Sequence, residues 1–282
     1  MEGQISDTGK WRVIFDSAHS AAANMAIDEA IVECHSAGMV PPTLRFYTWR
    51  PAALSIGYFQ KIKAEVNIAA CRSQGIDIVR RISGGRAVLH DQELTYSVVV
   101  REDLPVLPPT LLGSYRYLSQ GLLAGLNKIG IAAEMTLPGA AYGQSKPLPK
   151  NGACFDAPSF YEITVNHKKL IGSAQLRKNG TLLQHGSILL AFSAEQVASL
   201  LNFASAEERE WCQAVLQAKA TSLNSELGYI PDISELARTL ATEFGHTLEL
   251  EMVPANLTEQ EIKRAAVLEQ EKFAADSWTY RR

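Results

Sequence analysis

Cys154 is the residue whose type and setting first suggest chemistry in this sequence. The chain has four cysteines, and Cys34, Cys71 and Cys212 fall in helix-like apolar patterns where a thiol packs as a small hydrophobe. Cys154 instead lies in "NGACFDAPSFYE", a segment whose Pro, Asn, Gly and Ser residues are typical of a loop. A cysteine thiolate is a nucleophile that can carry an acyl group. The setting therefore favours a reactive thiol at this position.

Three basic side chains are candidates for activating this thiol. A nearby cation stabilises a thiolate, and Lys169 in "NHKK" begins a strand that follows the cysteine segment. A histidine base is the alternative, and both His90 and His185 lie in or beside strand-like segments. Each residue also has an ordinary interpretation, as part of a solvated turn or as a hydrogen-bonded core histidine. The residue pattern leaves the three candidates open.

The glycine-bearing segment "RRISGGRAVLHD" is the second chemical feature. Gly84 and Gly85 allow the backbone to adopt a positive φ and to approach a ligand closely. The segment is not a Walker loop, because it lacks the G-K-[ST] ending and no helix pattern follows it. A tight turn between two strands is the competing interpretation. Arg80 and Arg81 favour binding, because they point to opposite faces of a strand and at most one is expected to face the core.

These residues are positioned by helices that alternate with adjacent strands. Helical spacing of apolar residues predicts helices over 20–38, 63–75 and 109–130. Strand-like runs cover 43–60 with a break at Pro51, followed by 76–82 and 93–100. The last two runs are expected to form a hairpin-like pair with the glycine segment as the loop between them.

Three further strand-like runs follow, over 160–166, 168–177 and 181–190. Turns at Asn166-His167 and Asn179-Gly180 predict a meander. The remainder is mainly helical, with one strand over 246–253. Three pairs each fit a capping box: Ser193 with Gln196, Asp232 with Glu235, and Thr258 with Glu261. The sequence therefore predicts an α+β fold with a mixed, largely antiparallel sheet flanked by helices.

Composition narrows the class of protein. The chain has 282 residues, 46% of them hydrophobic, and a formal net charge of −3, which argues against a general nucleic-acid binder. Docking to an acidic partner would need a local basic patch. No apolar run is long enough to span a bilayer, and the N-terminal segment lacks a signal-peptide core, so we expect a cytoplasmic location. The scattered cysteines contain no C-x-x-C pair and argue against disulfides and a zinc site.

Three motifs together resemble the biotin/lipoate protein ligase superfamily, and in particular its cysteine-dependent octanoyltransferase branch, the LipM type. They are "RRISGGRAVLHDQELTYSV", "ACFDAPSFYEI" and "KKLIGSAQLRKNGTLLQHGSILL", and the similarity extends from "WRVIFDS" to the terminal "DSWTYRR". The resemblance implies a fold like that of class II aminoacyl-tRNA synthetases and biotin synthetases. It implies a catalytic domain over 38–252, with 1–37 packed onto it as an N-terminal strand and helix, and a helical C-terminal tail over 253–282.

The resemblance also implies an activity. Enzymes of this branch move an octanoyl group from acyl carrier protein to a lipoyl-domain lysine, usually of the glycine cleavage H protein, during lipoate biosynthesis, without a cofactor or metal. The acyl-thioester would form on Cys154, and Lys169, 15 residues later, would lower the pKa of its thiol. Substrate binding would involve Arg80, Arg81, Ser83, Gly84, Gly85, His90 and Gly172. We expect Val79, Val88 and Ile171 to line an apolar tunnel for the octanoyl chain, in a monomer that binds neither nucleic acid nor a membrane.

One departure from the ATP-using ligases separates the alternatives. Their loop carries three consecutive glycines, whereas here the third position is Arg86, a bulky cation in space that an adenylate would need. An ATP-dependent lipoate ligase is nevertheless the first alternative, and it should survive Cys154→Ala. The second is an amidotransferase that moves octanoyl between lipoyl domains. The third is a catalytically silent lipoyl-domain binding module, which the presence of both Cys154 and Lys169 disfavours.

Overall fold

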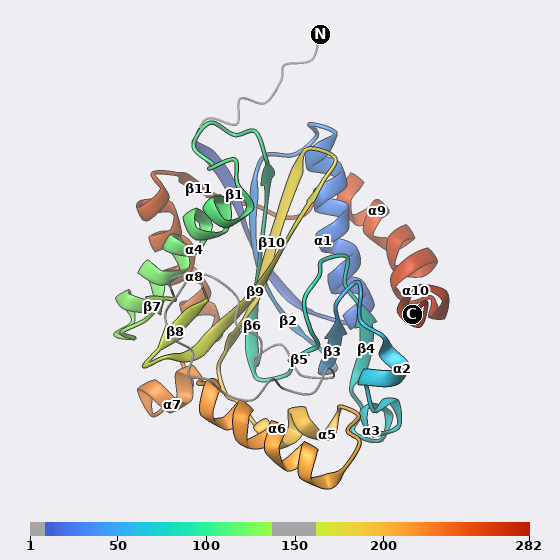
Figure 1. Cartoon of the computed structure of the whole chain (residues 1–282). Helices are drawn as coiled ribbons and strands as arrows, with labels where there is room; N and C mark the ends of the chain where they lie inside the picture. The colour runs from blue at the N-terminus through green and yellow to red at the C-terminus, as the bar shows by residue number, and fades with distance from the viewer. Residues whose placement is uncertain (1–8, 137–161) are drawn as a thin grey trace.

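A large mixed sheet organises the molecule (Figure 1), in a computed structural model that describes residues 9–136 and 162–282. Its strand order within the described residues is β11-β1-β2-β6-β10-β9-β8-β7. β1 is parallel to β11 and to β2, and the remaining neighbours are antiparallel, which confirms the predicted fold class. The strands are β1 (Lys10–His19), β2 (Thr43–Trp49), β6 (Glu93–Arg101), β7 (Glu134–Met135), β8 (Ile163–Val165), β9 (Lys168–Lys178), β10 (Thr181–Leu189) and β11 (Glu251–Pro254).

A small second sheet contains β3 (Ala53–Ile56) between β4 (Asp77–Arg80) and β5 (Val88–His90). β4 is parallel to β3, and β5 is antiparallel to it. The expected pairing of 76–82 with 93–100 is therefore wrong. The segment between them holds a strand of its own, and the almost fully buried β6 lies at the centre of the large sheet instead. A strand buried on both faces needs covering layers on both sides, and β6 has them at the centre of the large sheet.

Helices cover both faces of the large sheet (Figure 1). Alternate residues of a strand point to opposite faces, so Leu44 and Phe46 pack with α4 (Leu111–Lys128) and α8 (Ile233–Leu248), whereas Tyr47 and Trp49 pack with α1 (Ala21–Ser36). Gly121 and Gly125 allow α4 to approach α8 closely, because an added Cβ would lie 2.5 Å and 2.7 Å from α8 side chains. These two layers bury the apolar faces that the helical spacing predicted.

A third group of helices surrounds the small sheet and the adjoining end of the large one. It comprises α2 (Ile62–Glu65), α3 (Ile68–Ser73), α5 (Ala194–Ser199), α6 (Ala206–Lys219) and α7 (Leu223–Leu227). The single helix expected over 63–75 is two helices, because Val66 is extended and forms a β-bridge with Leu201. Asn67 then caps α3 through the backbone N–H of Ala70.

The predicted turns and N-caps are confirmed, but of the three expected capping boxes only that of Thr258 and Glu261 has both hydrogen bonds. Asn166, His167, Asn179 and Gly180 all have positive φ, so both two-residue turns of the meander are confirmed. The side chains of Ser193, Asp232 and Thr258 each accept a hydrogen bond from the backbone three residues later. The strand expected over 246–253 is shorter, because α8 continues to Leu248.

The C-terminal residues run back along α1. They form α9 (Glu259–Leu268), the π-helical turn η1 (Glu269–Phe273) and α10 (Asp276–Thr279). The Glu261 carboxylate makes a bidentate, buried ion pair with Arg12 of β1. The proposed division of the chain at 37/38 and 252/253 stays a prediction. Among the described helices, none has the length and apolar character needed to cross a membrane.

Candidate functional site

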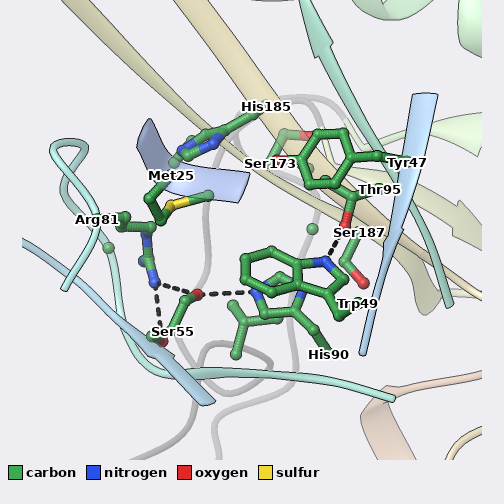
Figure 2. A pocket seen from close by; sticks show the side chains of 15 residues that line it. Met25, Tyr47, Trp49, Ser55, Arg81, His90, Thr95, Ser173, His185 and Ser187 are labelled. Atoms are coloured by element: carbon green, nitrogen blue, oxygen red, sulfur yellow. Dashed lines mark hydrogen bonds between the residues drawn. The ribbon is translucent and has the colours of Figure 1, made fainter. Parts of the chain in front are cut away.

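A pocket lies where α1 and the small sheet meet the end of the large sheet (Figure 2). Strands β2, β6, β9 and β10 contribute one wall, and β3, β5 and the glycine segment contribute the other. It is lined by Met25, Tyr47, Trp49, Ser55, Arg81, Gly85, Val88, His90, Thr95, Gly172, Ser173, Ala174, His185, Gly186 and Ser187.

The glycine segment forms one edge of this pocket. Gly85 is exposed and has a φ of +94°, and a Cβ on Gly57 would lie only 1.9 Å from its carbonyl oxygen. The Arg81 guanidinium donates hydrogen bonds to the carbonyl oxygens of Gly84 (2.8 Å) and Arg86 (2.7 Å). The glycines are therefore needed for close backbone packing, and Arg81 holds the turn in the shape that forms the edge of the pocket.

His90 stands on this side of the pocket within a chain of polar contacts. Its Nε2 lies 2.8 Å from Ser55 Oγ, which also accepts a hydrogen bond from Arg81. The imidazole stacks on Trp49 with ring centroids 4.0 Å apart. Burial lowers the pKa of His90, although Glu93 opposes the shift, so the ring is neutral at pH 7.

His185 occupies the opposite wall, above a buried carboxylate. Its Nε2 lies 2.5 Å from Ser83 Oγ, and its Nδ1 lies 3.5 Å from Asp28 Oδ2. Asp28 on α1 also accepts hydrogen bonds from Arg45 (2.8 Å) and Tyr47 (2.9 Å). Burial opposes ionisation of Asp28, but the contacts from His185 and Arg45 outweigh it and lower the pKa of the carboxyl. Asp28 is thus a fixed anion beneath the pocket.

The polar side chains of the wall are mostly bonded to one another. Besides the two histidine chains, Trp49 donates to Thr95 (2.7 Å) and Ser173 bonds to Tyr96 (2.7 Å). An apolar ligand would therefore leave few buried polar groups without a partner, which is the main cost of such a lining. Within the described residues, Ser187 Oγ and His90 Nδ1 are the lining atoms without a hydrogen-bond partner. The pocket is suited to an apolar chain with few polar contacts.

Lys169 lies near the start of β9, opposite Thr164 of β8. Its ammonium nitrogen is 2.5 Å from Glu162 Oε1, and both side chains are about 3% exposed. Its carbonyl oxygen accepts a hydrogen bond from the backbone of Thr221 (2.9 Å). A buried ammonium requires such a carboxylate partner. The solvated-turn interpretation therefore holds for the exposed Lys168 and not for Lys169.

The sequence matches the family described as "Lipoyl protein ligase A/B catalytic domain" over residues 20–245. It is 44% identical to octanoyltransferase LipM of Brevibacillus brevis over 97% of this chain and 99% of that protein. It is 40% identical to octanoyltransferase LipM of Bacillus subtilis over 96% of this chain and 98% of that protein. The chain belongs to the lipoyl protein ligase A/B catalytic domain family.

Solved structures of this family share the fold. A bipartite lipoate protein ligase from Thermoplasma acidophilum superposes with a TM-score of 0.79, at 23% identity and with 96% of both chains covered. A crystal structure of lipoate-protein ligase A bound with ATP gives a TM-score of 0.75 at 25% identity, over 96% of this chain and 98% of that one. In the described part of this family member, no group of three or more His, Cys, Asp or Glu side chains is arranged to hold a metal ion.

The structure places four of the predicted binding residues, Arg81, Gly85, His90 and Gly172, on the pocket lining. Ser83 and Gly84 lie just behind the lining: Ser83 Oγ is hydrogen-bonded to His185, and the Gly84 carbonyl oxygen accepts a hydrogen bond from Arg81. Whether any of these residues touches a substrate stays a prediction.

Arg80 corrects one expectation, that at most one of the two arginines would face the interior. Both are buried, Arg80 completely, because β4 is enclosed on each side. Arg80 donates to the carbonyl oxygens of Gly57, Tyr58, Gln60 and Thr279. It therefore ties the C-terminal residues to the small sheet, whereas Arg81 supports the glycine turn.

Cys154 lies outside the described residues, so its relation to Lys169 stays a prediction. Of the expected tunnel residues, Val88 lines the pocket, whereas Val79 and Ile171 lie in hydrophobic cores.

The residues that sequence reasoning missed are those brought to the pocket by strand pairing, chiefly Tyr47, Trp49 and the Asp28–Arg45 pair. A signal was present for the pair. Asp28 falls within the apolar pattern of α1, and Arg45 alternates with Leu44 and Phe46 in a fully buried part of β2. Two opposite charges in apolar segments are expected to be partners.

Proposed function

We propose that this chain transfers an octanoyl group from octanoyl-acyl carrier protein to a lipoyl-domain lysine, through an acyl-thioester on Cys154. The observation that carries the proposal is the pocket wall, whose polar groups are already bonded and which accepts an apolar chain at little cost. The near full-length likeness to octanoyltransferases supports the same acyl group.

The chemistry proceeds in two balanced steps. The Cys154 thiolate attacks the thioester carbonyl carbon of the donor, and the carrier thiol leaves as a thiolate that takes up a proton. The acceptor lysine, as the free amine, then attacks the acyl-thioester carbonyl carbon; the carbon–sulfur bond breaks, the nitrogen loses one proton to solvent as the amide forms, and the Cys154 thiolate is released. Exchange between thioesters is nearly neutral in free energy, so the first step needs no ATP. The lipoyl domain of the glycine cleavage H protein is the proposed acceptor, and the cytoplasm the proposed location.

Lys169 is the proposed source of positive charge for the thiolate. Its ammonium is held in place by Glu162, and this carboxylate also offsets part of its field. Lys169→Ala should therefore slow alkylation of Cys154 by iodoacetamide at neutral pH. Glu162→Gln leaves the buried Lys169 amine without this carboxylate, which favours its neutral form, so this variant should slow alkylation as well. Equal rates in all three proteins would contradict the proposed role.

The decisive experiment is intact mass spectrometry after mixing the chain with octanoyl-acyl carrier protein in the absence of ATP. We expect one octanoyl adduct, removed by hydroxylamine and absent in Cys154→Ala. Cys212→Ala is the matched control, since this buried thiol lies on α6 and should not affect the adduct. Absence of an adduct from the wild-type chain would show the transferase proposal to be wrong.

The same assay separates the alternatives. An ATP-dependent ligase would need ATP and free acid and would keep its activity in Cys154→Ala. An amidotransferase would acquire octanoyl from an octanoylated H protein in preference to the carrier protein. A silent binding module would form no adduct with any donor.

A further inference from the structure

Arginines and aromatic rings gather beside the small sheet, at the C-terminal residues of the chain. We call this the cationic–aromatic surface, and it consists of Tyr58, Phe59, Lys61, Trp278, Arg281 and Arg282. The Arg281 guanidinium lies between two rings, 3.8 Å from the centroid of Tyr58 and 3.9 Å from that of Trp278. Phe59 is 68% exposed, and the Arg282 guanidinium lies 5.5 Å from its ring. Figure 1 shows this end of the chain beside α2 and β4.

The positive charge of this surface is offset only in part, by the charge of Glu65 acting on Arg80. In the part of the chain that the structure describes, no carboxylate forms an ion pair with Arg281 or Arg282. The Glu65 carboxylate, which follows Lys61 closely, instead accepts hydrogen bonds from the Gln60 side chain and the Lys61 backbone. Burial and the charges of Arg281 and Arg282 lower the pKa of Arg80 to about 10, so these cations repel one another.

Two buried donors aim at no acceptor in this cluster. Arg80 Nη2 and Arg281 Nε are enclosed, and neither has a hydrogen-bond partner among the described residues. Stacking on Tyr58 and Trp278, with a hydrogen bond from Arg281 Nη2 to the Tyr58 carbonyl oxygen (3.4 Å), holds the Arg281 guanidinium in place. The arrangement therefore fixes this cation, and the exposed charges that a partner can reach are those of Lys61 and Arg282.

The surface is joined directly to the pocket. The backbone N–H of Tyr58 donates to the carbonyl oxygen of Ser83 (2.9 Å), two residues before the exposed pocket residue Gly85. Arg80 and Arg81 are adjacent in sequence, and they face the cationic surface and the pocket respectively. A partner bound here is next to the glycine edge of the pocket.

We propose that the cationic–aromatic surface docks the acyl donor, a carrier protein whose face presents carboxylates and the phosphodiester of its pantetheine arm. This inference rests on the proposed function. The donor carries an anionic phosphate between its protein surface and the thioester, and guanidinium groups match phosphate and carboxylate geometry. The acceptor instead delivers a lysine cation, which this surface would repel. Exposed Phe59 adds apolar contact at the same face.

The test uses the full chain with Lys61→Glu/Arg282→Glu, two exposed positions whose change spares the stacked Arg281. The matched control is Arg116→Glu/Lys128→Glu, with the same charge change on exposed positions of α4. We expect the Kd for holo-acyl carrier protein to rise about tenfold in the first variant at low ionic strength and less than about threefold in the control. An unchanged Kd in the first variant would refute the docking surface, whether or not the chain transfers octanoyl.

Acylation rates distinguish docking from damage to the pocket. Adduct formation from octanoyl-carrier protein should slow about tenfold in Lys61→Glu/Arg282→Glu, and adduct formation from octanoyl-pantetheine, which lacks the phosphate and protein, should be unchanged. Equal slowing with both donors would overturn the inference, as would slowing confined to transfer from the acyl-enzyme to the lipoyl domain. Failure of the wild-type chain to form any adduct would instead count against the proposed function, and the Kd comparison would still decide the docking site.

Discussion

Asp28→Asn tests how much the buried Asp28 carboxylate stabilises the wall of the pocket. Four donors surround the Asp28 carboxylate: Arg45 and Ser97 at Oδ1, and Tyr47 and His185 at Oδ2. The asparagine amide has nearly the same shape but one acceptor oxygen, and its NH₂ group must face two donors. If the NH₂ turns toward Tyr47, the hydroxyl can reorient and accept, but the contact with His185 Nδ1 is lost.

The magnitude follows from these contacts. A hydrogen bond with a charged partner is worth about 2 kcal/mol and a neutral one about 1 kcal/mol. Losing the His185 contact with the carboxylate (about 2 kcal/mol) and weakening the Arg45 contact to one with a neutral acceptor (about 1 kcal/mol) together cost about 3 kcal/mol of unfolding free energy. Arg45 keeps its second carboxylate, Asp16, at 2.8 Å, which limits the cost of an unpaired buried guanidinium. Asp16→Asn is the control, because Asp16 is partly exposed and its loss should cost about 1 kcal/mol.

Urea unfolding followed by tryptophan fluorescence measures both variants. The pH dependence gives a second readout, because the folded-state pKa of Asp28 lies below its ordinary value of 3.8. Its contribution is complete above that value and is lost as the pH falls toward the lower folded pKa, so Asp28→Asn should show a flatter acid limb than wild type. A loss of unfolding free energy under about 0.5 kcal/mol, with an unchanged dependence of stability on acid pH, would refute this account of the contacts around Asp28.

Three further outcomes are expected. Gly57→Ala should lower the free energy of unfolding by about 2 kcal/mol and slow adduct formation, because its Cβ would lie 1.9 Å from a carbonyl oxygen of the glycine turn. Gly84→Ala is the control: open space surrounds this position, so thermal unfolding should be nearly unchanged. Glu261→Gln should cost about 3 kcal/mol in urea unfolding, because it leaves the buried Arg12 guanidinium without its carboxylate. His90 should titrate in NMR spectra below its ordinary pKa of 6.5, because its ring is buried. The protein should become less stable as the pH drops below 6.5, because the unfolded chain then binds a proton that the buried ring does not. A titration at or above 6.5 would contradict this account.

Local signals in the sequence predicted most of the elements. Asn-Gly at 179–180 and the N-cap at Thr258 depend on neighbouring backbone only, and both were read correctly. The predicted elements and pairings were wrong where a segment pairs with a strand that is distant in the sequence. Val66 leaves its helix to bridge Leu201, and β4 joins β3 instead of β6. Neither partner can be identified from spacing, because the choice depends on which pairing covers the buried face of the strand.

The site divides in the same way. The glycine segment and His90 were predicted together because they are contiguous in the chain, although the short strand that carries His90 was not predicted. The polar contacts around Asp28 join α1, β2, β6 and β10, and these four segments come together only when the sheet folds. Long-range polar networks of this kind carry no spacing rule, although each buried charge in an apolar segment indicates that a partner exists.

The contacts of His90 and His185 bear on whether a histidine or Lys169 activates Cys154, a question that the residue pattern left open. His185 has Nε2 against Ser83 and Nδ1 facing the Asp28 carboxylate, so both ring nitrogens are committed to the wall. His90 has Nε2 against Ser55 and Nδ1 3.5 Å from Glu93, and its ring is pressed on Trp49. His185 would have to give up a buried contact to take a proton from a thiol, and so would His90 at Nε2, although His90 Nδ1 has no hydrogen-bond partner among the described residues. A lysine ammonium acts on a thiolate through its charge alone. Both histidines are therefore hydrogen-bonded parts of the pocket wall, which supports the proposal that Lys169 acts on the thiolate through its charge.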